Sequence, residues 1–310
     1  MKSKHNAVFT RGFRPIIFLL AVWGLTPCLQ AQDTNFNLQA TQAAADKGDA
    51  KAQYELGRHY VKVNGTTRAD YAKAAQFIRQ SAEQGYADAE VVLGSFYGRG
   101  LGVPRNVATA VHWYRKAADQ GNALAEYAMG EFYATGRGVT NDMNEAILWW
   151  KRAAGHNQVD AQDALGQFYL LPGTQYGTNY LDYPKAIQWL QRAAAQDSAG
   201  AMNNLGVAYE NGLGVKRDPN EAAHWYQQAA ERGNAAGQAN LGQLYFDGRG
   251  VTNDLVQAYK WFKLSASHGS VIGAAGFANF QAKPLLTPTQ LAEAEQSVLD
   301  FHPQPASGQP

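Results

Sequence analysis

The 310-residue chain has one cysteine, no excess of either charge and no apolar run long enough to cross a membrane. Lys and Arg number 27 against 26 Asp and Glu, so the formal charge is +1. A nucleic-acid-binding surface requires clustered basic residues, and this balance argues against one. The apolar run at residues 16–25 is well short of the roughly 20 residues that a transmembrane helix needs. We therefore expect no nucleic-acid partner and no membrane span.

The sequence also lacks the short motifs of several catalytic and phosphate-binding sites. It has no Gly-x-Ser-x-Gly elbow, no phosphate loop ending in Gly-Lys-Ser/Thr, no His-Glu-x-x-His and no Ser-x-x-Lys. We therefore predict a protein without catalytic residues, cofactor or metal ion.

The first 31 residues have the layout of a signal peptide. They contain four basic residues and no acidic ones, then the apolar run at 16–25, then Leu-Gln-Ala at 29–31. This order predicts export and cleavage after Ala31, which places the mature protein in the periplasm or outside the cell. Removing the segment leaves 23 of the 27 basic residues against 26 acidic ones. The mature chain is then mildly acidic.

The single cysteine, Cys28, lies inside this segment. The residues before it, 25–27, are similar to a bacterial lipoprotein box, but Pro27 stands where that motif has a small flexible residue. We therefore do not expect a lipid anchor. The mature chain has no cysteine for a disulfide.

A stretch of about thirty residues, clearest at 205–234, occurs six times in the chain, which is typical of a helix-hairpin repeat. Each copy contains a Leu-Gly or Met-Gly step, and the steps are 36 to 40 residues apart. The first residues of these steps are Leu56, Leu93, Met129, Leu165, Leu205 and Leu241.

Each copy predicts two helices, here called helix A and helix B. In the fifth copy, Leu205 and Ala208 lie on one face of helix A. Helix B has Ala222, Trp225 and Tyr226 at the i, i+3, i+4 spacing of a buried stripe. We expect the large, mostly aromatic residues at the last two of these positions to be buried in every copy.

The ends of helix B are also marked in the sequence. Asp218-Pro219 supplies an N-cap and a proline at the first helical position, and Glu221 is placed to reach back to the cap. Gly233 is expected to end the helix with a positive φ. His112 and His224 share one position of helix B, but three hairpins separate them, so they cannot share a metal ion.

The pattern Leu-Gly-x-x-Tyr-x-x-Gly-x-Gly-Val, followed by Asp-x-x-x-Ala-x-x-Trp-Tyr-x-x-Ala-Ala-x-x-Gly-Asn-Ala, resembles the Sel-one-like repeats, relatives of tetratricopeptide repeats. The resemblance covers about residues 38–300. It implies an α-solenoid that serves as a protein-binding scaffold, often outside the bacterial cytoplasm. The first copy departs from the pattern with Asn-Gly-Thr-Thr at 64–67, and the fourth has four extra residues.

From the resemblance and the caps we predict an all-α fold, a right-handed α-solenoid of helix-turn-helix repeats. Its expected parts are a signal peptide (1–31), a capping half-repeat (32–48), six repeats (49–270), C-terminal capping helices (271–302) and a disordered tail (303–310). The capping helices are expected at residues 271–282 and from Thr287 to about Phe301.

In tetratricopeptide-like stacks, helix A lines the concave groove, so we expect a partner to bind there. On helix A the offsets −2, +2 and +5 from the Leu-Gly leucine point away from the expected core. An insertion in the fourth copy adds two loop tyrosines that are expected to offer contact area. The candidate partner-binding residues are Tyr54, Arg58, Tyr127, Glu131, Asp163, Gln167, Tyr176, Tyr180, Asn203, Glu210, Gln243 and Phe246.

We therefore predict a monomeric, non-enzymatic protein-binding scaffold whose partner is another protein or a peptide. Two alternatives remain open at this stage. Some exported relatives resemble immunity proteins that neutralise a secreted toxic effector such as a lipase. Hydrolase activity, proposed for cysteine-rich relatives, is a more remote alternative.

Overall fold

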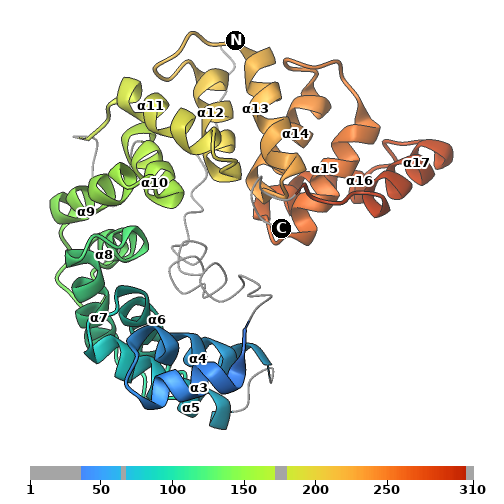
Figure 1. The fold of residues 1–310 in the computed structure, drawn as a ribbon. Coiled ribbons are helices and arrows are strands. Elements are labelled where there is room, and N and C mark those ends of the chain that lie inside the picture. Colours follow the sequence, from blue (N-terminus) through green and yellow to red (C-terminus); the bar gives the residue numbers. More distant parts are fainter. Residues whose placement is uncertain (1–35, 64–67, 172–179, 305–310) are drawn as a thin grey trace. The chain divides into compact units, whose positions relative to one another are not determined.

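The computed structural model describes residues 36–63, 68–171 and 180–304, which form fifteen α-helices and contain no strand (Figure 1). The prediction of an all-α helical-repeat fold is confirmed. The helices are α3 (Leu38–Asp46), α4 (Ala50–Val63), α5 (Arg68–Glu83), α6 (Ala87–Arg99), α7 (Val107–Asp119), α8 (Ala123–Thr135), α9 (Met143–Gly155), α10 (Val159–Leu170), α11 (Tyr183–Ala194), α12 (Ala199–Asn211), α13 (Pro219–Glu231), α14 (Ala235–Asp247), α15 (Leu255–Ser267), α16 (Val271–Ala282) and α17 (Pro288–Leu299).

The chain divides into two compact units, residues 1–153 and 154–310. Within each unit, helices A and B of one repeat pack against each other, as α4 does on α5 and α12 on α13. Inside a unit, helix B also packs against the helix A that follows it, as α5 does on α6 and α13 on α14. Each unit is therefore a stack of helical hairpins.

The glycine of the Leu-Gly step allows the two helices of a repeat to approach closely. A Cβ atom on Gly206 would lie 2.5 Å from Cδ1 of Tyr226, and one on Gly130 would lie 2.3 Å from Cδ1 of Trp150. Real Cβ contacts are essentially never shorter than 3.0 Å. The leucine beside this glycine, such as Leu205, is fully buried. The Leu-Gly step therefore combines a buried leucine with a glycine at which helix B lies too close for any side chain.

Burial corrects the prediction for the aromatic pair of helix B. The second position is buried in all six repeats, with Tyr226 only 1 % exposed. Trp225, at the first position, is only half-buried, although Trp149 and Trp261 are buried. In the second, third and fourth repeats, a Lys or Arg three residues later lies over the tryptophan ring, with the Arg192 guanidinium carbon 4.8 Å from the Trp189 ring centroid. The first position is therefore less uniformly buried than the second, and in these three repeats a cation of the same helix covers its ring.

Polar side chains inside the core tie helices together. Gln238 is fully buried; its Nε2 donates to the carbonyl of Ala230 at 3.1 Å, and its Oε1 lies 3.0 Å from Nδ1 of His268. Gln53 makes the equivalent contacts with Ala45 and Gln84. This buried amide therefore connects the helix A that carries it to helix B of the preceding repeat and to the end of helix B in its own repeat.

The helix B caps match the sequence prediction except in one contact. The Asp218 side chain accepts from the backbone N–H groups of Asn220 and Glu221 at 3.0 and 3.3 Å, and Gly233 has φ +78°. The predicted reach of the Glu221 side chain back to the cap is not formed. The backbone N–H of Asp218 donates instead to the carbonyl of Tyr209 at 2.9 Å, so it is already used.

The C-terminal end of the second unit consists of α16 and α17, both in contact with α15. Thr287 and Gln290 form a capping box at the start of α17. This helix ends at Leu299, two residues before the expected Phe301, whose ring packs against Trp261. Glu295 accepts from the Tyr259 hydroxyl and pairs with Lys263, which fixes α17 on α15. Gln304, inside the predicted tail, donates its backbone N–H to Glu231 at 2.8 Å, and residues 305–310 lie outside the described range.

Candidate functional site

The candidate site is the row of helix A side chains in the second unit, where α12 contacts both α10 and α14. Asn203 of α12 is half-buried, and its Oδ1 accepts from Nδ2 of Asn240 on α14 at 2.9 Å. Gln167 on α10 and Gln243 on α14 are also half-buried. These three residues place amide groups on successive helices of the stack.

Two of the predicted contact residues in the first unit are in the core. Tyr54 is 4 % exposed and Tyr127 1 % exposed, so the prediction that they face away from the core is wrong. Tyr54 packs with Ala89 and Val92 of the next helix A, and its ring centroid is 5.1 Å from that of Tyr86. A helix A inside a stack has neighbouring hairpins beside it as well as its own helix B, and in these two copies the neighbours cover the residue two positions before the leucine.

The other two candidates of the first unit keep some exposure. Arg58 lies over the Tyr54 ring, 5.5 Å from its centroid, and its Nη1 is 3.8 Å from Oε2 of Glu55. Glu131 is half-buried on α8.

Asp163 is held by the next helix A of the second unit. Its Oδ1 accepts from Nδ2 of Asn204 at 3.3 Å, and its Oδ2 lies 3.4 Å from Oγ of Ser198, the N-cap residue of α12. Desolvation raises the pKa of Asp163 to about 7, against the hydrogen bonds from Asn204 and Ser198 and with the charge of Asp160 adding to the rise. Asp163 therefore acts first as a contact between α10 and α12.

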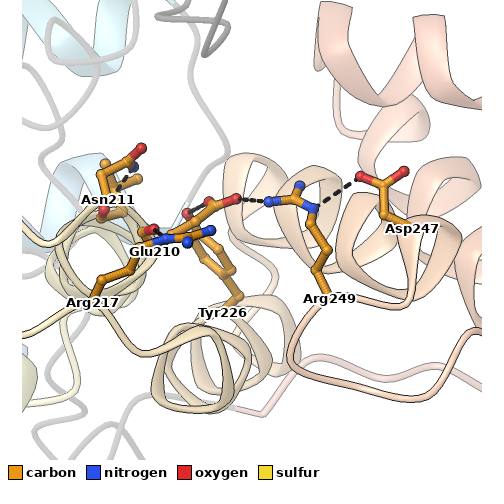
Figure 2. A network of polar contacts seen from close by, with 7 residues as sticks. Glu210, Asn211, Arg217, Tyr226, Asp247 and Arg249 are labelled. Carbon is orange, nitrogen blue, oxygen red and sulfur yellow. Dashed lines mark hydrogen bonds and ion pairs between the residues drawn. The ribbon is translucent and has the colours of Figure 1, made fainter. Parts of the chain in front are cut away.

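Glu210 is the centre of a polar network rather than an unpaired groove residue (Figure 2). Its Oε2 accepts from the Tyr226 hydroxyl at 2.7 Å, and its Oε1 lies 2.5 Å from Nη1 of Arg249. Nε of Arg249 also donates to Oδ2 of Asp247 at 3.1 Å. Nε of Arg217 donates to the backbone carbonyl of Glu210 at 3.0 Å. The carboxylate thus joins the turn of the sixth repeat to helix B of the fifth.

Burial and the Glu210 charge both raise the pKa of Tyr226, so its hydroxyl stays a donor. Desolvation alone would lower the pKa of Arg249, but Glu210 and Asp247 raise it. The network therefore places the Glu210 carboxyl group between the Arg249 guanidinium and the Tyr226 hydroxyl.

The remaining candidates lie at the edges of the row. The half-buried Phe246 has its ring centroid 6.0 Å from that of Phe280 on α16. Tyr180, from the insertion of the fourth repeat, packs its ring 5.2 Å from that of Phe168. This contact favours a packing role for Tyr180. Tyr176 lies outside the described residues.

The chemistry that these side chains offer is hydrogen bonding by amides and apolar contact by aromatic rings. Both His112 and His224 are exposed on helix B. Within residues 36–63, 68–171 and 180–304 there is no group of three or more His, Cys, Asp or Glu that could hold a metal ion. None of the helices in these ranges is long and apolar enough to cross a membrane.

The sequence-based selection missed the partners that fix the row. Arg249, Tyr226, Asn204 and Asn240 all contact candidate residues, yet none had been selected. The sequence does contain a pattern that indicates a role for Arg249, because arginine occupies the same turn position in the third repeat, at Arg137.

Comparison with known proteins agrees with this architecture. Six segments match the family described as Sel1 repeat: residues 50–86, 87–122, 123–157, 159–198, 199–234 and 235–270. No curated protein matches the chain.

Solved structures with the same repeats are similar over most of the chain. The protective antigen c5321 of uropathogenic Escherichia coli, which displays an SLR fold, is 36% identical with a TM-score of 0.71 over 86% of this chain. The present chain spans only 56% of that protein. A Sel1 repeat protein from Oxalobacter formigenes is 28% identical with a TM-score of 0.68, covering 83% of this chain and 99% of its own.

The immunity protein Pa5087 from Pseudomonas aeruginosa also matches, at 21% identity and a TM-score of 0.45, over 77% of this chain and 89% of its own. At this TM-score the match carries no argument about function.

Proposed function

Because the chain belongs to the Sel1 repeat family, we propose that it is an exported, non-enzymatic scaffold that binds another protein on the helix A side of its repeats. The partner contacts the half-buried side chains of α10, α12 and α14. Gln167, Asn203 and Gln243 are the residues that we assign to this contact.

The contrast between two classes of position carries the proposal. Positions that hold the stack together keep the same residue type from copy to copy, such as the glycine of the Leu-Gly step and the first alanine of helix B. The half-buried helix A positions differ between copies, as Arg58, Glu131 and Gln243 do. A surface without a repeating residue type suits a partner whose own surface does not repeat.

The side chains of the row support recognition rather than reaction. Amide groups offer both donors and acceptors, and the Phe246 ring offers apolar area, which are the means by which proteins bind one another. Asp163 and Glu210, the acidic members, are each held by neighbours inside the stack. We therefore assign no catalytic role to this surface.

Export rests on the sequence of residues 1–31, which lie outside the described part of the chain. Sequencing the N-terminus of protein recovered from the periplasm is expected to give Gln32. Recovery from the cytoplasm with an intact Met1 would contradict export.

Capture of the partner by purified mature protein from a periplasmic extract tests the binding surface. Gln167→Arg combined with Gln243→Arg places two long charged side chains on helix A and is expected to lower the captured amount at least tenfold. His224→Arg adds a charge on the exposed face of helix B and is the matched control. Equal capture by both variants would overturn the assigned surface.

A further inference from the structure

Helix B of the third repeat, α9, carries a large apolar side chain on its solvent side. Leu148 is 55 % exposed, two residues after the first alanine of the helix. The other five copies have a polar residue at this position: Gln76, His112, Gln188, His224 and Lys260. A single exposed leucine is ordinary by itself, so its neighbours on the same face decide what it can do.

Two exposed cations stand beside Leu148 on α9. Lys151 and Arg152 follow it by three and four residues, the spacing at which side chains of a helix are neighbours. Within the described part of the chain, neither of them forms an ion pair with a carboxylate. Leu148, Lys151 and Arg152 together form what we call the α9 patch, an apolar side chain next to two positive charges.

Arg152 is held in place by a tryptophan. Its guanidinium carbon lies 4.7 Å from the Trp149 ring centroid, and that of Arg115, on α7, lies 4.9 Å from it. Trp149 itself is only 4 % exposed. The contact with the ring holds the Arg152 guanidinium group without supplying a hydrogen-bond acceptor, so its N–H groups stay available for a carboxylate.

The preceding helix B has cations at the same two positions, but both are used inside the stack. Arg115 stands on α7 at the position of Lys151, and its Nη2 donates to the Tyr133 hydroxyl at 2.5 Å. Lys116, at the next position, lies 3.3 Å from Oε1 of the buried Glu90. The α9 patch differs from this pair because its cations remain open to a ligand.

The chain itself shows what meets the Lys151 position when a further helix packs on helix B. In the sixth repeat this position is Lys263, which pairs with Glu295 of α17. This helix packs on α15 and contains two glutamates and no basic residue. Phe301, just after α17, has its ring centroid 5.5 Å from that of Trp261. The covering element is therefore an acidic segment that also supplies apolar contacts.

We propose that the α9 patch binds an acidic segment of another protein. Asp or Glu side chains of the segment pair with Lys151 and Arg152, and an apolar residue beside them packs on Leu148. Opposite charges of this kind speed association and select the partner. The patch lies on helix B of the first unit, so the proposal goes beyond the helix A contact in the second unit and does not depend on it.

Fluorescence anisotropy with labelled peptides built from the unit Glu-Leu-Glu-Glu tests the patch. The mature protein is expected to bind this peptide at least tenfold more tightly than its Gln-Leu-Gln-Gln and Glu-Ala-Glu-Glu counterparts. Lys151→Gln combined with Arg152→Gln is expected to raise the Kd at least tenfold. Leu148→Gln introduces the residue that the first and fourth repeats carry there, and it is expected to raise the Kd at least threefold. Arg99→Gln removes an exposed positive charge outside the patch and is expected to change the Kd by less than twofold. Thermal unfolding verifies that each variant is folded.

Transfer of the patch to the fourth repeat gives a test that does not rely on loss of binding. Gln188, Gln191 and Arg192 of α11 are exposed at the three positions of the patch. Gln188→Leu combined with Gln191→Lys completes the same set of side chains and is expected to add a second binding event for the Glu-Leu-Glu-Glu peptide.

Several results would overturn the proposal. These are no binding of the acidic peptide by wild type, an effect of Arg99→Gln as large as that of the double charge variant, or a single binding event after the transfer. Patch-dependent binding to phosphatidylglycerol vesicles without binding of the peptide would also overturn it and assign the cations to a membrane surface. Partner capture that depends on Gln167 and Gln243 would still stand in each case, so failure here is distinguishable from failure of the proposed function.

Discussion

Gly206 faces Tyr226 so closely that an added Cβ atom would lie 2.5 Å from the Tyr226 ring carbon Cδ1. The same helical glycine meets the second large residue of helix B in every repeat, from Gly57 against Ile78 to Gly242 against Phe262. Close approach of the two backbones therefore sets the spacing of each hairpin.

Gly206→Ala is expected to destabilise the protein by about 1–3 kcal/mol, because the methyl group has to displace a buried ring. Gly155→Ala is the matched control, since nothing lies within 4 Å of a Cβ built at the end of α9. Its stability is expected to stay the same or rise slightly, because alanine favours the helix. Denaturant unfolding measures both, and equal effects would contradict the close contact.

The burial of helix B predicts an order of effects at three consecutive residues. Tyr226→Ala leaves a cavity in the core and is expected to cost about 3–5 kcal/mol. Trp225→Ala is expected to cost less, because this side chain is half-buried at the edge of the core. His224→Ala should change the free energy of unfolding by less than about 0.5 kcal/mol, as an exposed residue does. A larger loss from Trp225→Ala than from Tyr226→Ala would show that the helix register is wrong.

The raised pKa of Asp163 predicts that the free energy of unfolding depends on pH. Its pKa is raised from 3.8 to about 7 in the folded protein, so between these values the folded chain holds a proton that the unfolded chain has lost. The free energy of unfolding is therefore expected to fall as the pH rises from about 4 to about 7, by at most about 1.4 kcal/mol per unit. Asp163→Asn keeps a neutral group at this position at every pH. The variant should flatten this slope and be more stable than wild type at pH 8.

Urea unfolding of both proteins between pH 4 and pH 8 measures this difference. Parallel curves for wild type and Asp163→Asn would show that Asp163 titrates near its ordinary value. The expected outcome is that the two curves approach each other as the pH falls towards 4, because the folded and unfolded chains then differ less in the proton that this carboxyl group holds.

The repeat period, the hairpins and most helix ends could be predicted from sequence, because glycine, proline and capping residues recur in register. The predicted Asp218 cap and the capping box at Thr287 are both present. Burial within the stack was harder to predict. A helical wheel separates one buried face from one open face, whereas helix A in a stack is covered on several sides, and Tyr54 and Tyr127 are buried for this reason.

The buried polar side chains of helix A were not predicted, because Gln and Glu are ordinarily surface residues. A signal was nevertheless present, since the position three residues before the Leu-Gly leucine is polar in five of the six copies. These residues are Gln53, Glu90, Glu126, Gln162 and Gln238, and all of them are buried. The contacts around Glu210 were missed for another reason. They join residues 16 and 39 positions apart, a separation that periodicity within one helix does not connect.

Site-specific photo-crosslinking in the native cell tests the central claim that helix A carries the protein-binding surface. A photo-reactive amino acid placed at Gln167 or at Gln243 is expected to form a covalent adduct with one and the same protein. The same amino acid at His224, on the exposed face of helix B, is expected to form none. Adducts of that protein from His224, and none from Gln167 or Gln243, would contradict the account.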